Sequence, residues 1–135
     1  MLALLLLYMA WAVWLGALVF FSFVIAPTVH QVFDRPEAAR LLGRLFPRYY
    51  LFGVGCGAVA IGAALRVHND LRLTAPLVVA TVLSLYARQV LTPALEQARA
   101  ADDDGRFARL HVSSVRLNLV ALAALVLAGT VLIGL

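Results

Sequence analysis

The stretch Leu2–Pro27, LALLLLYMAWAVWLGALVFFSFVIAP, contains no charged side chain. A helix needs about 20 predominantly apolar residues to cross the hydrocarbon core of a bilayer, which is about 30 Å thick. Open strands are excluded there, because their backbone groups would have no hydrogen-bond partners. This stretch therefore predicts a helix that spans a membrane.

Three further segments extend the same prediction to the rest of the chain. They cover about residues 49–66, 73–100 and 105–134, and each is predominantly apolar over most of its length. Together with the first segment, at about residues 2–27, they predict an all-α fold, an integral membrane four-helix bundle. A chain of 135 residues is long enough for one such domain, so we expect residues 1–135 to form a single transmembrane domain.

The composition excludes most other classes of protein. Hydrophobic residues make up 64% of the chain and charged residues only 13%, against roughly 45–50% and about 25% in an ordinary soluble domain. The single cysteine, Cys56, excludes an internal disulfide framework. The net charge is +4, and the basic residues are arginines in a predominantly apolar chain. We therefore expect a lipid bilayer as the partner and no nucleic acid.

The arginines predict an orientation. Nine of the eleven fall in or beside the first and third connections, and only Arg66 and Arg72 flank the second. Cytoplasmic connections carry the excess of basic residues. We therefore expect a multi-pass protein of the cell inner membrane with both termini outside, on the periplasmic side, and with the long first and third connections in the cytoplasm.

The first connection has the pattern of a short amphipathic helix at about residues 35–46. Asp34 and Pro36 are typical of a helix start, and Pro47 favours an end. We expect this helix to lie at the membrane surface, although a helix that binds a partner protein would have the same pattern. The arginines expected to contact anionic phospholipid headgroups are Arg40, Arg44, Arg48, Arg109 and Arg116.

Small residues follow one face of the second span. Gly53 and Gly57 are four residues apart, a spacing that lets helices approach closely in lipid. The pattern leaves two alternatives open: the neighbouring helix belongs to the same chain, or the Gly53/Gly57 face forms a homo-oligomer.

A stripe of neutral polar side chains marks the start of the fourth span. His111, Ser114 and Asn118 fall on one helix face. Such residues either hydrogen-bond between helices or line a small binding site. We expect any such site to lie near the cytoplasmic face, with Tyr49 or Tyr50 close to it.

No cofactor is predicted, and the sequence favours a non-enzymatic protein. It contains no serine-histidine-aspartate order, no glycine-rich phosphate loop and no paired carboxylates within the spans. His30 and His111 are weak candidates for a haem or copper site, because both are expected at the cytoplasmic ends of their helices. A membrane redox protein that uses these two histidines is therefore one alternative, and a small transporter or channel subunit acting as an oligomer is another.

The sequence also contains a short internal repeat and a family resemblance. Val24–Pro27 recurs as Val90–Pro93, 66 positions later. The chain resembles the transmembrane protein 205-like family, whose members are small four-helix membrane proteins, in the segments Phe23–Pro27, Arg40–Tyr50, Leu91–Pro93 and Phe107–Asn118. The resemblance implies that the family's motif positions are Pro27, Gly43, Phe46, Pro47, Tyr49, Tyr50, Pro93, His111, Ser114 and Asn118.

A more distant resemblance involves the first span. Trp14, Gly16 and Phe20, which run on to Pro27, are similar to the copper-resistance-D-like superfamily, which includes a haem-binding oxidase. No histidine precedes His30, where the first helix of that oxidase carries an axial ligand. The chain departs from the oxidase pattern at that point.

Overall fold

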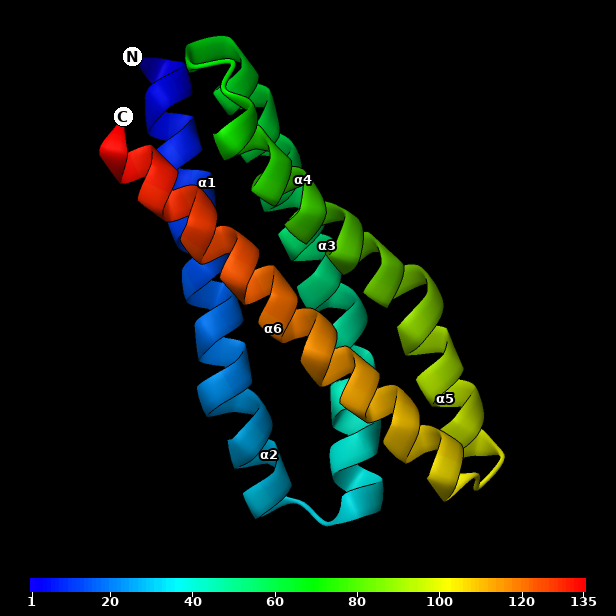
Figure 1. Ribbon diagram of the computed structural model, residues 1–135. Helices are drawn as coiled ribbons and strands as arrows, with labels where there is room; N and C mark the ends of the chain where they lie inside the picture. The colour runs from blue at the N-terminus through cyan, green and yellow to red at the C-terminus, as the bar shows by residue number, and fades with distance from the viewer.

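The computed structural model describes all residues from Met1 to Leu135, and it confirms the four-helix bundle. Four long helical stretches run up and down, and there are no strands (Figure 1). The elements are α1 (Leu2–Phe20), the π-helical turn η1 (Phe21–Ile25), α2 (Ala26–Val32), α3 (Arg35–Val67), α4 (Leu71–Tyr86), the π-helical turn η2 (Ala87–Leu91), α5 (Thr92–Ala100) and α6 (Asp104–Gly134).

Each helical stretch is longer than a bilayer requires. Counted without interruption, the four stretches contain 31, 33, 30 and 31 residues, whereas about 20 residues span the hydrocarbon core. The expected long connections are therefore helical, and only residues 33–34, 68–70 and 101–103 link the stretches. Both termini lie at one end of the bundle, and the first and third turns lie at the other (Figure 1).

An aspartate begins each helix that follows a turn. The side chains of Asp34, Asp70 and Asp103 accept hydrogen bonds from backbone N–H groups in the first turns of α3, α4 and α6. Such a cap provides a partner for one of the four N–H groups that every helix leaves free at its start. Each of the three short turns therefore ends in a capped helix start.

Residues 35–46, which we expected as a separate surface helix, are instead the first turns of α3. Pro47 lies inside this helix and does not end it. A proline removes one hydrogen bond and crowds the carbonyl group four residues earlier. Here that carbonyl belongs to Gly43, whose backbone tilts more freely than that of other residues. Packing of Ala38 and Leu42 against Val29 of α2 holds the turns before the proline in place.

Two other prolines each follow a π-helical turn, toward the end of the bundle where the first and third turns lie, called the arginine-rich end below. Pro27 comes after η1 and Pro93 after η2, at equivalent positions. In both turns a backbone N–H bonds five residues back, from Ala26 to Phe21 and from Thr92 to Ala87. A π-helical turn accommodates one extra residue in a helix. The internal repeat therefore has a structural counterpart in the two halves of the chain.

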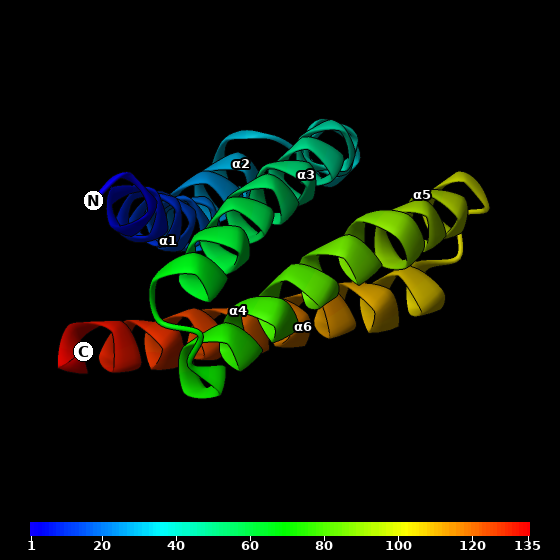
Figure 2. The ribbon, with the colours of Figure 1, turned by 90° about the horizontal axis from the view of Figure 1, so that it is seen from above.

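The helices pack as two hairpins. α1 packs mainly on α3, α4 mainly on α6, and α3 joins the two pairs through α4. Seen from above, the α1–α3 pair and the α4–α6 pair form two layers (Figure 2). The largest fully buried side chains are Leu7, Leu73, Leu77, Leu125 and Leu132. Many apolar side chains point outward on all four stretches, as expected where the surrounding solvent is lipid.

Two side-chain hydrogen bonds connect α1 to α6 near the termini. Trp11 Nε1 donates to the carbonyl oxygen of Leu125 at 2.8 Å, and the Tyr8 hydroxyl donates to that of Leu132 at 3.2 Å. The ring of Trp11 also lies directly against Gly129, where a Cβ atom would overlap it. α1 and α6 therefore contact closely at the end where the termini lie.

The Gly53/Gly57 face is used within the chain. A Cβ atom added to Gly53 would lie 2.8 Å from Nε1 of Trp14, and one added to Gly57 would overlap Thr81 of α4. Both glycines are buried. The close approach that they allow within the chain is therefore between α3 and its neighbours α1 and α4.

Candidate functional site

Asn118 of α6 joins two neighbouring tyrosines of α3. The Tyr49 hydroxyl donates to Asn118 Oδ1 at 3.4 Å, and Asn118 Nδ2 donates to the Tyr50 hydroxyl at 3.4 Å. Tyr50 is only 3% exposed. A polar group within a bilayer is costly without a partner, so this arrangement provides partners for three side chains at once.

Aromatic rings surround these polar groups. The ring of Phe21, from η1, stacks on that of Tyr49 at a centroid distance of 4.3 Å. Phe46 lies one turn before Tyr50 on α3, with ring centroids 5.8 Å apart, and 5.3 Å from Phe21. Phe21 of η1 thus packs on Phe46 and Tyr49 of α3.

A cavity of about 190 Å³ opens beside this cluster. It lies between α6 and the chain around η1, and α3 contributes Phe46. Its three polar residues are Ser22, His111 and Asn118. The remaining lining residues are apolar: Leu18, Phe21, Phe23, Ala26, Phe46, Val115, Leu119 and Leu122. The arrangement suits a small, largely apolar group that also makes one or two hydrogen bonds.

The two candidate histidines lie near each other. The ring centroids of His30 and His111 are 6.4 Å apart and the rings are almost perpendicular. Phe107 lies parallel to His111 at the same centroid distance. No group of three or more His, Cys, Asp or Glu side chains is placed so that it could hold a metal ion.

The structure divides the polar stripe that the sequence places on one face. His111 and Asn118 line the cavity, whereas Ser114 is 4% exposed and lies on the buried side of α6 with Leu117 and Ala121. Ser22 and Phe21 line the cavity as well, although sequence analysis did not single them out. Their position depends on the π-helical turn, which changes the helix face that each residue occupies and has no signal in a 3.6-residue period.

The remaining predicted residues lie around the arginine-rich end. Gly43 faces α5, where an added Cβ atom would lie 3.3 Å from Glu96 Oε2. All five arginines expected at phospholipid headgroups are exposed, and none of them forms an ion pair. The ion pairs of the chain are Arg72 with Asp70 and Arg99 with Glu96. Arg88, in η2, has a buried Nε atom without a hydrogen-bond partner.

Comparison with known proteins gives one family and one relative. The family described as "Domain of unknown function (DUF4149)" matches residues 9–104, from α1 to the first residue of α6. An "Uncharacterized protein" of Aquifex aeolicus (strain VF5) is 32% identical over 121 residues, which cover 88% of this chain and 86% of the relative. No solved structure matches the chain. On the extent of the family match, the chain belongs to the family of the domain of unknown function DUF4149.

Proposed function

We propose that this multi-pass membrane protein binds a small amphipathic molecule in the cavity between α6 and η1. The observation that supports the proposal is the lining of this cavity. Its walls are apolar apart from three polar residues, Ser22, His111 and Asn118. Pockets for drug-sized molecules measure about 300–1,000 Å³. A volume of about 190 Å³ instead fits a small molecule or one end of a longer one.

Each polar residue has a role in this proposal. The hydroxyl of Ser22 and the imidazole of His111 hydrogen-bond the polar end of the ligand. Asn118 is already engaged by Tyr49 and Tyr50, so it fixes the position of the wall. Phe21, Phe23 and Phe46 contact the apolar part.

Native mass spectrometry of the full chain, purified in a mild detergent, tests the proposal. The Val115→Trp substitution fills the cavity, whereas Val112→Trp, an equally exposed position on the same helix, leaves it open. We expect a bound small molecule in the unsubstituted protein and in the Val112→Trp variant, and its loss in the Val115→Trp variant. A molecule retained equally by both variants would exclude this cavity as its site.

We also propose that the membrane is the cell inner membrane and that the arginine-rich end faces the cytoplasm. Nine of the eleven arginines lie toward that end, in the helical stretches that flank the first and third turns. Basic residues are retained on the cytoplasmic side during insertion. The termini are then outside.

A finer family placement is part of the proposal. The segments Arg40–Tyr50 and Phe107–Asn118 support membership of the transmembrane protein 205-like family. Their residues Phe46, Tyr49, Tyr50, His111 and Asn118 contribute to the aromatic cluster, the cavity or the hydrogen bonds between them.

Metal binding by His30 and His111 is the second candidate function. The observation in its favour is the 6.4 Å separation of the two rings. Imidazole nitrogens are ligands for copper and iron. An absorption spectrum and a metal analysis of the purified protein test it: a metal or haem that is lost in the His30→Ala variant supports this function, and a colourless, metal-free protein excludes it.

A further inference from the structure

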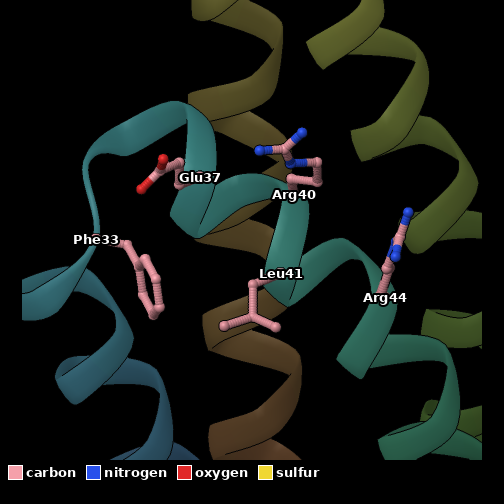
Figure 3. A pocket seen from close by; sticks show the side chains of 5 residues that line it. All are labelled: Phe33, Glu37, Arg40, Leu41 and Arg44. Atoms are coloured by element: carbon pink, nitrogen blue, oxygen red, sulfur yellow. The ribbon is translucent and has the colours of Figure 1, made fainter.

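A second pocket, of about 380 Å³, lies at the arginine-rich tip (Figure 3). Its lining residues are Phe33, at the end of α2, and Glu37, Arg40, Leu41 and Arg44, in the first three turns of α3. It shares no residue with the cavity between α6 and η1. The two pockets are therefore separate.

The pocket contains two arginines that have no acidic partner. Arg40 and Arg44 are exposed and lie one helical turn apart, and neither forms an ion pair. Glu37 is the only carboxylate among the lining residues, so the pocket has a net positive charge. A guanidinium group presents several N–H donors in a plane that matches the oxygens of a phosphate.

The apolar residues of the pocket lie on the side toward the middle of the bundle. In Figure 3 the side chains of Phe33 and Leu41 point downward beside each other, in the direction from which α2 arrives. Glu37 and Arg40 lie above them, and the side chain of Arg44 points up, toward the tip. The pocket is thus charged toward the tip and apolar toward the bundle. A phospholipid has the same order of polarity, from its headgroup to its acyl chains.

The position of the arginines along α3 agrees with the headgroup layer. Counting about 20 residues back from the end of α3 at Val67 places the edge of the hydrocarbon core near residue 48. At about 1.5 Å per residue, Arg44 then lies about 6 Å and Arg40 about 12 Å beyond that edge. A whole bilayer is about 40–45 Å thick, so both flexible side chains reach the headgroups.

We propose that this pocket binds one anionic phospholipid. Arg40 and Arg44 bind its phosphate, and Phe33 and Leu41 contact the glycerol ester region, where the acyl chains begin. A free phosphate ion offers the same charged group, but it would leave the exposed ring of Phe33 and the side chain of Leu41 without a role.

The test measures lipid binding to the delipidated full chain in detergent. The probes are dioleoyl-phosphatidylglycerol, dioleoyl-phosphatidylcholine and inorganic phosphate. The double substitution Arg40→Gln/Arg44→Gln removes the two charges from the pocket. Arg35→Gln/Arg106→Gln is the matched control, because it removes two exposed charges from the starts of α3 and α6, at the same end of the molecule and outside the lining of the pocket.

We expect phosphatidylglycerol to bind about tenfold more weakly to the Arg40→Gln/Arg44→Gln variant, which corresponds to about 1.4 kcal/mol. Its affinity for the control variant should change by less than about threefold. In the Phe33→Ala variant, the affinity for phosphatidylglycerol should fall by a larger factor than the affinity for inorganic phosphate.

Equal losses of affinity in both double variants would show general attraction to a basic surface. Equal binding of phosphatidylglycerol and phosphatidylcholine would exclude a preference for anionic lipids. Competition by millimolar phosphate would assign the pocket to a free ion. Each of these three results would overturn the proposal.

Discussion

At the scale of single residues, one amide group organises the polar centre of the bundle. Asn118 accepts from Tyr49 and donates to Tyr50, so residues distant in the sequence hold α3 against α6. Interhelical hydrogen bonds in membrane proteins contribute about 0.6–2 kcal/mol each. The side chain that lines the cavity is therefore also part of what holds the helices together.

The Asn118→Leu substitution should lower the free energy of unfolding by about 1–2 kcal/mol, because it removes the partner of two tyrosine hydroxyls. Tyr50→Phe should cost less, since one bond is lost and the freed amide can turn. Tyr86→Phe is the matched control, because Tyr86 is exposed and its hydroxyl makes no hydrogen bond. Reversible unfolding in mixed detergent micelles measures all three. An effect of Tyr86→Phe as large as that of Tyr50→Phe would contradict this role of Asn118.

Two glycines mark the closest contacts between helices. A Cβ atom at Gly57 would overlap Thr81, and one at Gly129 would overlap Trp11. We expect Gly57→Ala and Gly129→Ala each to destabilise the protein by about 1–3 kcal/mol, the usual cost of overpacking. Gly55 and Gly62 have nothing within 4 Å of an added Cβ atom. Gly55→Ala and Gly62→Ala should therefore be neutral or slightly stabilising, and thermal unfolding that ranks the four variants differently would refute the packing described.

At the scale of elements, the two π-helical turns relate the halves of the chain. Both precede a proline, and both lie where a transmembrane helix passes into the arginine-rich end. The pair of prolines was visible in the sequence, but the extra residue in each turn was not. The sequence is apolar on both sides of each turn, so a period of 3.6 residues fits it with or without the extra residue. The hydrophobic pattern therefore does not show that residues beyond the turn occupy a different helix face.

Deletion of one residue tests the π-helical turn of the first hairpin. Removing Val24, an exposed residue of η1, should return the turn to ordinary α-helix and leave the packing of α1 largely intact. Removing Val13, an exposed residue of α1, should rotate the residues before it by about 100° relative to the rest of the helix. We expect the first variant to elute as a folded species in size-exclusion chromatography and the second to aggregate. Equal aggregation of both would argue against a one-residue insertion at η1.

The sequence predicts the four spans well, because every position that faces lipid must be apolar. The four spans therefore follow from composition alone. The end of a helix depends on local competition instead. Pro47 indicates an end, but Ala38 and Leu42, in the turns before it, pack on α2, and α3 continues through the proline. For the candidate site, His111 and Asn118 share a face by spacing, whereas the burial of Ser114 depends on how α6 crosses its neighbours.

At the scale of the whole molecule, charge and shape agree. Both termini lie at one end, the first and third turns lie at the other, and most of the arginines are found toward that second end (Figure 1). The helical stretches are longer than the hydrocarbon core, so the arginine-rich ends extend into or past the headgroups. Both pockets lie toward this end: the cavity between α6 and η1 lies within the spans, and the pocket that Arg40 and Arg44 line lies at the tip.

The most direct test of four alternating membrane crossings is the labelling of single cysteines by a membrane-impermeant maleimide. In a Cys56→Ser background, Arg35→Cys, Leu71→Cys and Ala101→Cys each place one thiol beside a different turn. In spheroplasts, where the outer face of the inner membrane is accessible, we predict labelling of the Leu71→Cys variant alone, and labelling of the other two only after permeabilisation. The reverse pattern would contradict the proposed orientation. Labelling of all three variants from the same side would contradict the four membrane crossings themselves.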